Sequence, residues 1–302
     1  MHVPGSGIPR VPSQNESLPG SNAPSVIHAA RQNSDPAARA KAQMALSFLD
    51  GPASLIDSLT ELTEVANELV EKYLAGVSGE AMSSEAVIEK SVLKVAGLRD
   101  AIFVGHIKTD LDSIAGAIGA AALFDGTPAA AQRELNGEIQ FALDFAKLKA
   151  PKFFDDIPGA SKRCPITDGF CKVCLVDHNE LKQMTPSLRE DPRRADRIVG
   201  LIDHHAVSEG FISKRALLVD VRPWGSMSSI VTHMYLRANI YMPKQIARIM
   251  LCAILSDTLN LQSVTTTKAD RIMVAILARL GDVGDFTAIG ELAKAQFKAK
   301  TQ

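Results

Sequence analysis

Four apolar runs in the chain end on aspartate or histidine. The runs and the polar residues behind them are 101–105 with His106, Asp110 and Asp112, 173–176 with Asp177, 198–202 with Asp203, His204 and His205, and 251–256 with Asp257. Such runs are typical of buried parallel strands, and open α/β sheets bind ligands at the carboxyl ends of their strands. We therefore expect the four ends to converge in space.

The acids and imidazoles of these segments indicate a site for divalent cations. Asp110 and Asp112 are two residues apart, so on an extended loop both would face the same way. Crowded carboxylates repel one another, and divalent cations neutralise that charge. Carboxylate and imidazole ligands without thiolates favour Mn²⁺, Co²⁺, Fe²⁺ or Zn²⁺ over Ca²⁺. The acids suffice for two ions that share a carboxylate, and two metals about 3.5–4 Å apart suit the hydrolysis of phosphoryl bonds.

The order of these motifs resembles the DHH phosphoesterase superfamily. The residues that carry the likeness are 105–113 (GHIKTDLDS), 177–180 (DHNE) and 203–205 (DHH). Three further segments narrow the resemblance to the manganese-dependent, family II inorganic pyrophosphatases, namely 136–138 (NGE), 224–226 (WGS) and 254–258 (ILSDT). The likeness covers roughly residues 100 to 302. The order and spacing of the segments make it specific.

The resemblance implies a hydrolase that splits pyrophosphate into two phosphates at a two-metal site. By that resemblance one transition metal is held by His106, Asp110 and Asp177, and the other by Asp112, Asp177, His204 and Asp257. It implies Mn²⁺ or Co²⁺, two per site, with a metal-bridging hydroxide as nucleophile and Mg²⁺ arriving with the substrate. His205 and Asp203 are the implied catalytic residues. His205 would contact substrate phosphate and protonate the leaving group, and Asp203 would orient a ligand or its strand.

Several candidate residues also have a plainer interpretation. His178 and His205 could simply be structural residues at strand ends. Lys108 stands where the family commonly has asparagine, and it could contact an anionic substrate or be solvated. Ser226 begins a helix whose amides could bind phosphate, or it is only an N-cap. Three lysines of the last helix are expected on a solvated face: Lys294, Lys298 and Lys300.

Two other functions remain open. One is a sister DHH enzyme, an exopolyphosphatase or an oligonucleotide phosphodiesterase. The 177–180 motif favours pyrophosphatase, and 5% aromatic residues with a net charge of −1 give little sign of a nucleic-acid groove. The other is an inactive metal-binding subunit with a regulatory or scaffold role. It gains weight because the family's C-terminal domain, with its Ser-Arg-Lys-Lys-type motif, is expected to be missing, which would impair activity.

Apolar patterning predicts strands that alternate with helices. Strands are expected at 101–105, 128–131, 172–176, 198–202 and 216–221, and helices at 113–124, 138–148, 185–196, 226–237, from 243, at 268–280 and at 286–300. Thr267 and Asp270 look like a capping pair for the helix at 268–280, and 149–170 is expected to be a long loop. The alternation predicts an α/β fold, a doubly wound and mostly parallel sheet with helices on both faces.

Composition predicts three regions in the 302 residues. Residues 1–40, rich in Pro, Ser and Asn, are expected to be disordered. Residues 41–98 are expected to form a helical extension packed on the main domain, with an apolar stripe of Leu55, Leu59, Leu62, Ala66 and Leu69. Residues 99–302 form the expected DHH metal-binding domain.

Cysteines and hydropathy bear on the compartment and the partners. Cys164, Cys171 and Cys174 lack a nearby fourth soft ligand, so a zinc site is not expected. Few cysteines suit a reducing compartment, and a cytoplasmic protein is expected, with organellar targeting by the N-terminal segment left open. No apolar run approaches the about 20 residues of a membrane helix. The expected partners are pyrophosphate and a second copy in a homodimer, with no nucleic acid and no membrane.

Overall fold

The computed structural model describes residues 52–79, 83–207 and 212–301. Its centre is a parallel six-stranded sheet with the order β3-β2-β1-β4-β5-β6. The strands are β1 (Ile102–Val104), β2 (Thr127–Ala130), β3 (Lys152–Phe153), β4 (Val173–Val176), β5 (Ile198–Asp203) and β6 (Leu218–Val221). The predicted α/β fold with a doubly wound parallel sheet is confirmed.

The strand order reverses between β1 and β4, which are hydrogen-bonded neighbours. From β1 the chain steps to β2 and β3 on one side, and from β4 it steps to β5 and β6 on the other. Open α/β sheets bind ligands where the order reverses, at the carboxyl ends of the strands. His106 follows β1 and Asp177 follows β4, so both lie at this position.

Alternate strand residues face two separate cores, as the pleat of a strand requires. Phe103, Cys174 and Ile202 pack in the larger core, which is filled by α5 (Leu111–Phe124), α9 (Met227–Arg237) and α10 (Lys244–Asp257). Ile102 and Leu175 pack in the smaller core on the opposite face. That face is covered by short elements: η1 (Phe154–Asp156), η2 (Leu181–Gln183), α7 (Pro186–Arg189) and α8 (Arg194–Arg197).

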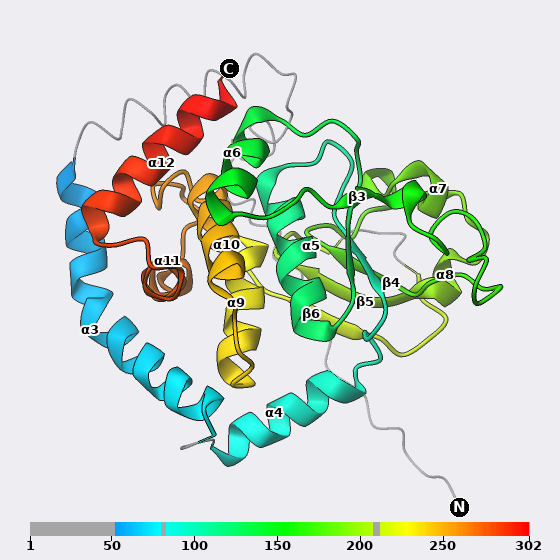
Figure 1. Ribbon diagram of the computed structural model, residues 1–302, viewed down its shortest axis with the longest axis horizontal. Coiled ribbons are helices and arrows are strands. Elements are labelled where there is room, and N and C mark those ends of the chain that lie inside the picture. The colour runs from blue at the N-terminus through cyan, green and yellow to red at the C-terminus, as the bar shows by residue number, and fades with distance from the viewer. Residues whose placement is uncertain (1–51, 80–82, 208–211, 302) are drawn as a thin grey trace, which may run out of the picture.

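The remaining helices of the main domain begin at side-chain caps. They are α6 (Gly137–Ala146), α11 (Lys268–Gly281) and α12 (Phe286–Lys300), capped by Asn136, Thr267 and Asp285. Thr267 and Asp270 form the capping box that the sequence predicted. In Figure 1, α11 and α12 lie on the side of α10 away from the sheet. α11 and α12 therefore form a second layer of helices behind α10.

The helical extension comprises α3 (Pro52–Val77) and α4 (Ser84–Val95). α3 runs along α11 and α12 (Figure 1), and the Tyr73 hydroxyl donates to the Ile240 carbonyl at 2.6 Å. Ala66 and Val70 are buried, but Leu69 is 39% exposed, so the predicted stripe was wrong at that residue. The side chains of Leu55, Leu59 and Leu62 lie outside the described part, as do residues 1–40.

Three local predictions need correction. The helix predicted from 243 is α10, so the apolar run before Asp257 is the end of that helix and not a strand like the other three runs; a short buried run fits either element. The predicted loop at 149–170 contains β3 and η1, and the predicted helix at 185–196 is two short helices, α7 and α8. Within the described ranges, none of the helices has the length and apolar character that crossing a bilayer requires.

Candidate metal centre

The loop between β1 and α5 holds His106 beside Asp110. The His106 ring donates from Nδ1 to the Ile107 carbonyl at 2.8 Å. Its Nε2 then lies 3.5 Å from Asp110 Oδ2 and 3.3 Å from Asp177 Oδ2. Asp110 is the N-cap of α5 and accepts from the Ser113 amide at 3.0 Å. Asp110 and Asp112 therefore sit at the start of a helix, and the expected extended loop was wrong.

Asp177 directly follows β4 and has a left-handed backbone conformation, with φ of 61°. The side chain is fully buried. Its Oδ2 accepts a hydrogen bond from the Ser113 hydroxyl at 3.0 Å. Its Oδ1 lies 3.2 Å from His204 Nε2 and has no other close hydrogen-bond donor among the residues that the structure describes. Asp177 therefore faces an imidazole with each of its oxygens.

Asp112 lies in the first turn of α5, and its buried carboxylate meets the N-terminus of α9. Its carboxylate accepts from the Met227 amide at 2.7 Å and the Ser228 amide at 3.1 Å. The hydroxyls of Ser226 and Ser228 donate to it at 3.0 and 2.5 Å. Burial raises the pKa of Asp112, and the neighbouring charge of Asp177 adds to this. The helix N-terminus offsets part of that cost, because its amides favour a negative charge.

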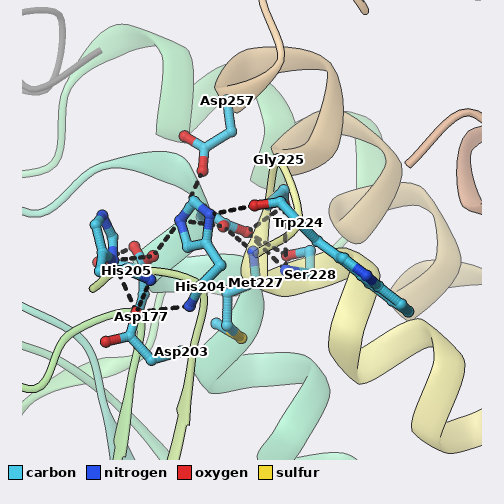
Figure 2. A network of polar contacts seen from close by, with 12 residues as sticks. Asp177, Asp203, His204, His205, Trp224, Gly225, Met227, Ser228 and Asp257 are labelled. Carbon is cyan, nitrogen blue, oxygen red and sulfur yellow. Dashed lines mark hydrogen bonds and ion pairs between the residues drawn. The ribbon is translucent and has the colours of Figure 1, made fainter. Parts of the chain in front are cut away.

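His204 joins the segments from β5, α9 and α10. Its Nδ1 donates to the Trp224 carbonyl at 2.9 Å, which fixes the ring as Figure 2 shows. Its Nε2 lies 3.4 Å from Asp257 Oδ2 and 3.9 Å from Asp112 Oδ2. Asp257 reaches this position from the last turn of α10.

These side chains form three groups whose ligand atoms lie within 4.8 Å of one another. The groups are His106, Asp110 and Asp177; Asp112, Asp177, His204 and Asp257; and Asp177, His204 and His205. Asp177 belongs to all three. The structure thus brings together every residue that the sequence proposed as a metal ligand. Their role as ligands stays a prediction.

The electrostatics of these groups fit a bound cation. His106 and His204 each use Nδ1–H on a carbonyl, so a neutral ring turns the lone pair of Nε2 toward carboxylate oxygens. Two acceptors at about 3.3 Å repel unless a proton or a metal ion lies between them. Without metal, burial disfavours charged His106, yet Asp110 and Asp177 raise its pKa. Burial likewise opposes charge on Asp177, yet His106 and His204 lower its pKa.

Asp203 orients its neighbours and belongs to none of the three groups. Its Oδ1 accepts from the His204 amide at 2.8 Å, the His205 amide at 3.1 Å and His205 Nδ1 at 2.7 Å. Its Oδ2 accepts from Asn179 Nδ2 at 2.7 Å. Burial alone would raise the pKa of Asp203, but the His205 ring lowers it. The carboxylate is thus fully engaged in holding this turn.

The other candidates lie around the centre. Lys108 is exposed on the loop after β1, with φ of 58°. Ser226 is a buried N-cap, and its hydroxyl donates to Asp112. Its contact with substrate stays a prediction. His178 is buried and donates from Nδ1 to the Val176 carbonyl at 2.9 Å. Burial, aided by the charge of His106, lowers the pKa of His178 to about 4.

Sequence reasoning missed a buried ion pair beside Asp257. Lys300 lies 2.7 Å from Glu138 Oε2, and its side chain is only 17% exposed, so the expected solvated position was wrong. Glu138 Oε1 accepts from the Ser256 hydroxyl at 2.6 Å and from Gln296 at 3.1 Å. The pair links α6, α10 and α12, three elements that are distant in sequence. Local periodicity carries no signal for such a contact.

The chain matches known proteins over the same region. The family described as "DHH family, N-terminal domain" matches residues 101–254. A Lactococcus lactis protein named probable manganese-dependent inorganic pyrophosphatase is 34% identical over 212 residues, which are 68% of this chain and 62% of that protein. A Deinococcus radiodurans protein of the same name is 35% identical, and the match covers 65% of this chain and 58% of that protein.

A solved structure shows the same likeness. It is a Methanococcus jannaschii protein assigned to the family II inorganic pyrophosphatases, with a TM-score of 0.55 and 29% identity. The match covers 65% of this chain and 60% of that one. The chain therefore spans about three-fifths of the length of the relatives it matches.

Proposed function

The chain belongs to the DHH family, and we propose that it carries the metal-binding site of a manganese-dependent inorganic pyrophosphatase. The observation that carries the proposal is the pair of ligand groups that share Asp177. Relatives named probable manganese-dependent inorganic pyrophosphatases support the choice of pyrophosphate as substrate and of Mn²⁺ as metal. The proposed cofactors are two Mn²⁺ or Co²⁺ ions, with Mg²⁺ bound to pyrophosphate.

The proposed ligands divide into two sets. His106 and Asp110 hold one ion with Asp177, and Asp112, His204 and Asp257 hold the other with Asp177. Bound divalent ions supply a water of low pKa and neutralise charge on the substrate. The protein's part is to fix the donors. A further hydrogen bond orients each of five of them: His106, Asp110, Asp112, Asp177 and His204. Ile107, Ser113, Trp224 and the amides of α9 supply these bonds.

His205 is the proposed group for substrate phosphate. Asp203 accepts from its Nδ1 at 2.7 Å, which holds the ring in place. Its Nε2 has no hydrogen-bond partner in the described part of the chain. Protonated His205 would then donate from Nε2 to a phosphate oxygen and could pass a proton to the leaving group.

The proposal is tested by phosphate release from pyrophosphate in the presence of Mn²⁺, with and without added Mg²⁺. We expect release that chelation abolishes and Mn²⁺ restores. Tripolyphosphate and a dinucleotide belong in the same panel, because faster cleavage of either would assign the chain to a sister activity. Tight Mn²⁺ binding without cleavage of any of the three would instead support a regulatory or scaffold subunit.

Variants of the two ligand sets sharpen that test. His106→Gln and Asp257→Asn each remove one proposed ligand from a different set. Each should weaken Mn²⁺ binding at its own site at least about tenfold to a hundredfold and should lower the rate of phosphate release. Asp144→Asn, an exposed carboxylate on α6, is the matched control and should change neither value.

The proposal extends to the setting of the protein. Cys164, Cys171, Cys174 and Cys252 are all free thiols in the structure, which suits a reducing compartment such as the cytoplasm. A homodimer is the proposed assembly. Sedimentation of the full chain with and without Mn²⁺ tests it, and a single monomeric species would contradict it.

A further inference from the structure

Residues 224–228 hold two of the proposed ligands. This segment, called the 224–228 loop, is the end of the loop before α9 together with the first two residues of that helix. The Trp224 carbonyl accepts from His204 Nδ1 at 2.9 Å. Three and four residues later, the Met227 and Ser228 amides donate to the Asp112 carboxylate at 2.7 and 3.1 Å. A shift of this loop would move both side chains together. Figure 2 shows the loop beside His204, and along the chain Gly225 lies between the two contacts.

Asp270 fixes this loop from the first turn of α11. The carboxylate is fully buried. Its Oδ2 accepts from the Gly225 amide at 2.9 Å, and its Oδ1 accepts from the Ser229 hydroxyl at 2.6 Å. The same Oδ2 also accepts from the Thr267 amide and hydroxyl, which form the capping box of α11. One carboxylate therefore ties the start of α11 to both sides of the α9 N-terminus.

Packing at Gly225 extends the connection to a third ligand. A Cβ atom at this position would lie 2.9 Å from Asp270 Oδ2 and 2.9 Å from Thr258 Cγ2. Thr258 directly follows Asp257 and is itself fully buried. The loop thus packs between Asp270 and the end of α10. A single segment therefore contacts or borders three proposed ligands: Asp112, His204 and Asp257.

The other ligand group has separate supports. His106 is oriented by the Ile107 carbonyl and by the Thr109 hydroxyl, which donates to the His106 carbonyl at 2.9 Å. Asp110 accepts from the Ser113 amide. These contacts lie within the loop between β1 and α5 and involve neither Asp270 nor the 224–228 loop.

We propose that Asp270 is a positioning residue for one metal site only, the site of Asp112, His204 and Asp257. This inference rests on the proposed function, because it assigns Asp270 to one of the two proposed ions. Asp270 touches none of the ligands. It acts through Gly225 and Ser229, which hold the loop that orients them. Partners of this kind typically change metal affinity by about 10–100-fold when they are lost.

The test is calorimetric titration of Mn²⁺ into the metal-free full chain and its Asp270→Asn variant. The asparagine keeps the size of the side chain, but its amide cannot accept from both Gly225 and Ser229. We expect two binding sites in each protein, with affinity lowered about 10–100-fold at one site and unchanged at the other. Asp257→Asn and His106→Gln identify the sites, and the weakened site should be the one that Asp257→Asn weakens.

Thr267→Val is the matched control for a merely structural role. It removes one half of the same capping box but leaves Asp270 bonded to Gly225 and Ser229. It should lower thermal stability without a site-selective loss of Mn²⁺ affinity. If Thr267→Val weakens the same site as strongly, or if Asp270→Asn weakens both sites equally or neither, the inference is overturned. Ser229→Ala, a milder change, should weaken the same site by a smaller factor.

A metal-free measurement separates this inference from the proposed function. Amide hydrogen exchange at Met227 and Ser228 should be faster in Asp270→Asn than in the parent chain or in Thr267→Val. Unchanged exchange would overturn the positioning role even if two Mn²⁺ ions bind. A parent chain that binds no Mn²⁺ would overturn the proposed function and the metal role of Asp270 with it, whatever the exchange rates.

Discussion

Replacement of Asp257 by asparagine should stabilise the metal-free protein and weaken its response to Mn²⁺. Asp257 ends α10, where the negative end of the helix dipole disfavours another negative charge. Its carboxylate also belongs to the group that contains Asp112 and Asp177. Three carboxylates therefore crowd one place, and among the four members of that group only His204 can offset their charge.

The size of the effect follows from the spacing of the group. Two ionised carboxylates whose oxygens lie within 4.8 Å of each other repel by at least about 3.5 kcal/mol at an effective dielectric constant of about 20. Protonation of one carboxylate and contact with solvent relieve most of this, which leaves a net gain of about 1–2 kcal/mol for the asparagine variant. At about 2–4 °C per kcal/mol, the Tm of the metal-free protein should rise by about 2–8 °C.

The response to Mn²⁺ should change in the opposite direction. At a hundred times Kd, each site adds about 2.7 kcal/mol to the free energy of unfolding. A ligand lost from one site weakens it at least about tenfold to a hundredfold, because even partners behind the ligands have that effect. The rise in Tm on adding Mn²⁺ should therefore be several degrees smaller in Asp257→Asn than in the parent chain.

Thermal unfolding in chelator and in Mn²⁺, for the parent and two variants, measures both effects. Asp144→Asn is the control, because Asp144 is an exposed carboxylate in the last turn of α6 and lies outside the three groups. This variant should shift Tm only by the small effect of removing a charge near the C-terminus of α6. The shift should be the same in chelator and in Mn²⁺. A lower Tm for Asp257→Asn in chelator, or an unchanged Mn²⁺ response, would refute the idea of carboxylates crowded around a cation site.

Three further outcomes are expected. Lys300→Met should lower the free energy of unfolding by about 3–5 kcal/mol, because it leaves the buried Glu138 carboxylate without its partner. Urea unfolding measures this loss, and the double variant with Glu138→Gln should recover most of it. Burial, with the charges of Arg222 and Arg237, lowers the pKa of His233 from 6.5 to about 4, so the folded state binds fewer protons than the unfolded state and stability falls as pH drops through that interval. Urea midpoints of metal-free His233→Gln should depend less on pH there, and an unchanged dependence would contradict this. Gly105→Ala should destabilise by about 1–3 kcal/mol by calorimetry, because its Cβ would lie 2.6 Å from Ser113 Cβ.

The sequence predicted the sheet and the candidate ligands because both leave local signals. Buried strands are short apolar runs, and the acids and imidazoles that follow β1, β4 and β5 mark one edge of the sheet. The capping box of Thr267 and Asp270 is likewise a local pattern. The run before Asp257 was ambiguous, because a buried helix and a buried strand are equally apolar over six residues.

The contacts that orient the ligands left no such signal. Asp270 looked like a helix cap, and only the folded chain shows that it also bonds Gly225, which is 45 residues away. Lys300 looked solvated because its helix carries other lysines, but its partner Glu138 lies on α6. Leu69 continued an apolar pattern on α3 and is nevertheless exposed. In each case packing between distant elements decided the outcome.

The left-handed backbone of Asp177 limits what mutagenesis at that position can reveal. With φ of 61°, the residue occupies a region that asparagine and aspartate tolerate and that most other side chains enter only at a cost of about 1–2 kcal/mol. Alanine, glutamate or valine there would alter the turn at the end of β4 as well as the chemistry. In a saturation library, asparagine alone would report on the lost charge with the main chain left in place, and the general intolerance of the site would overstate its chemical importance.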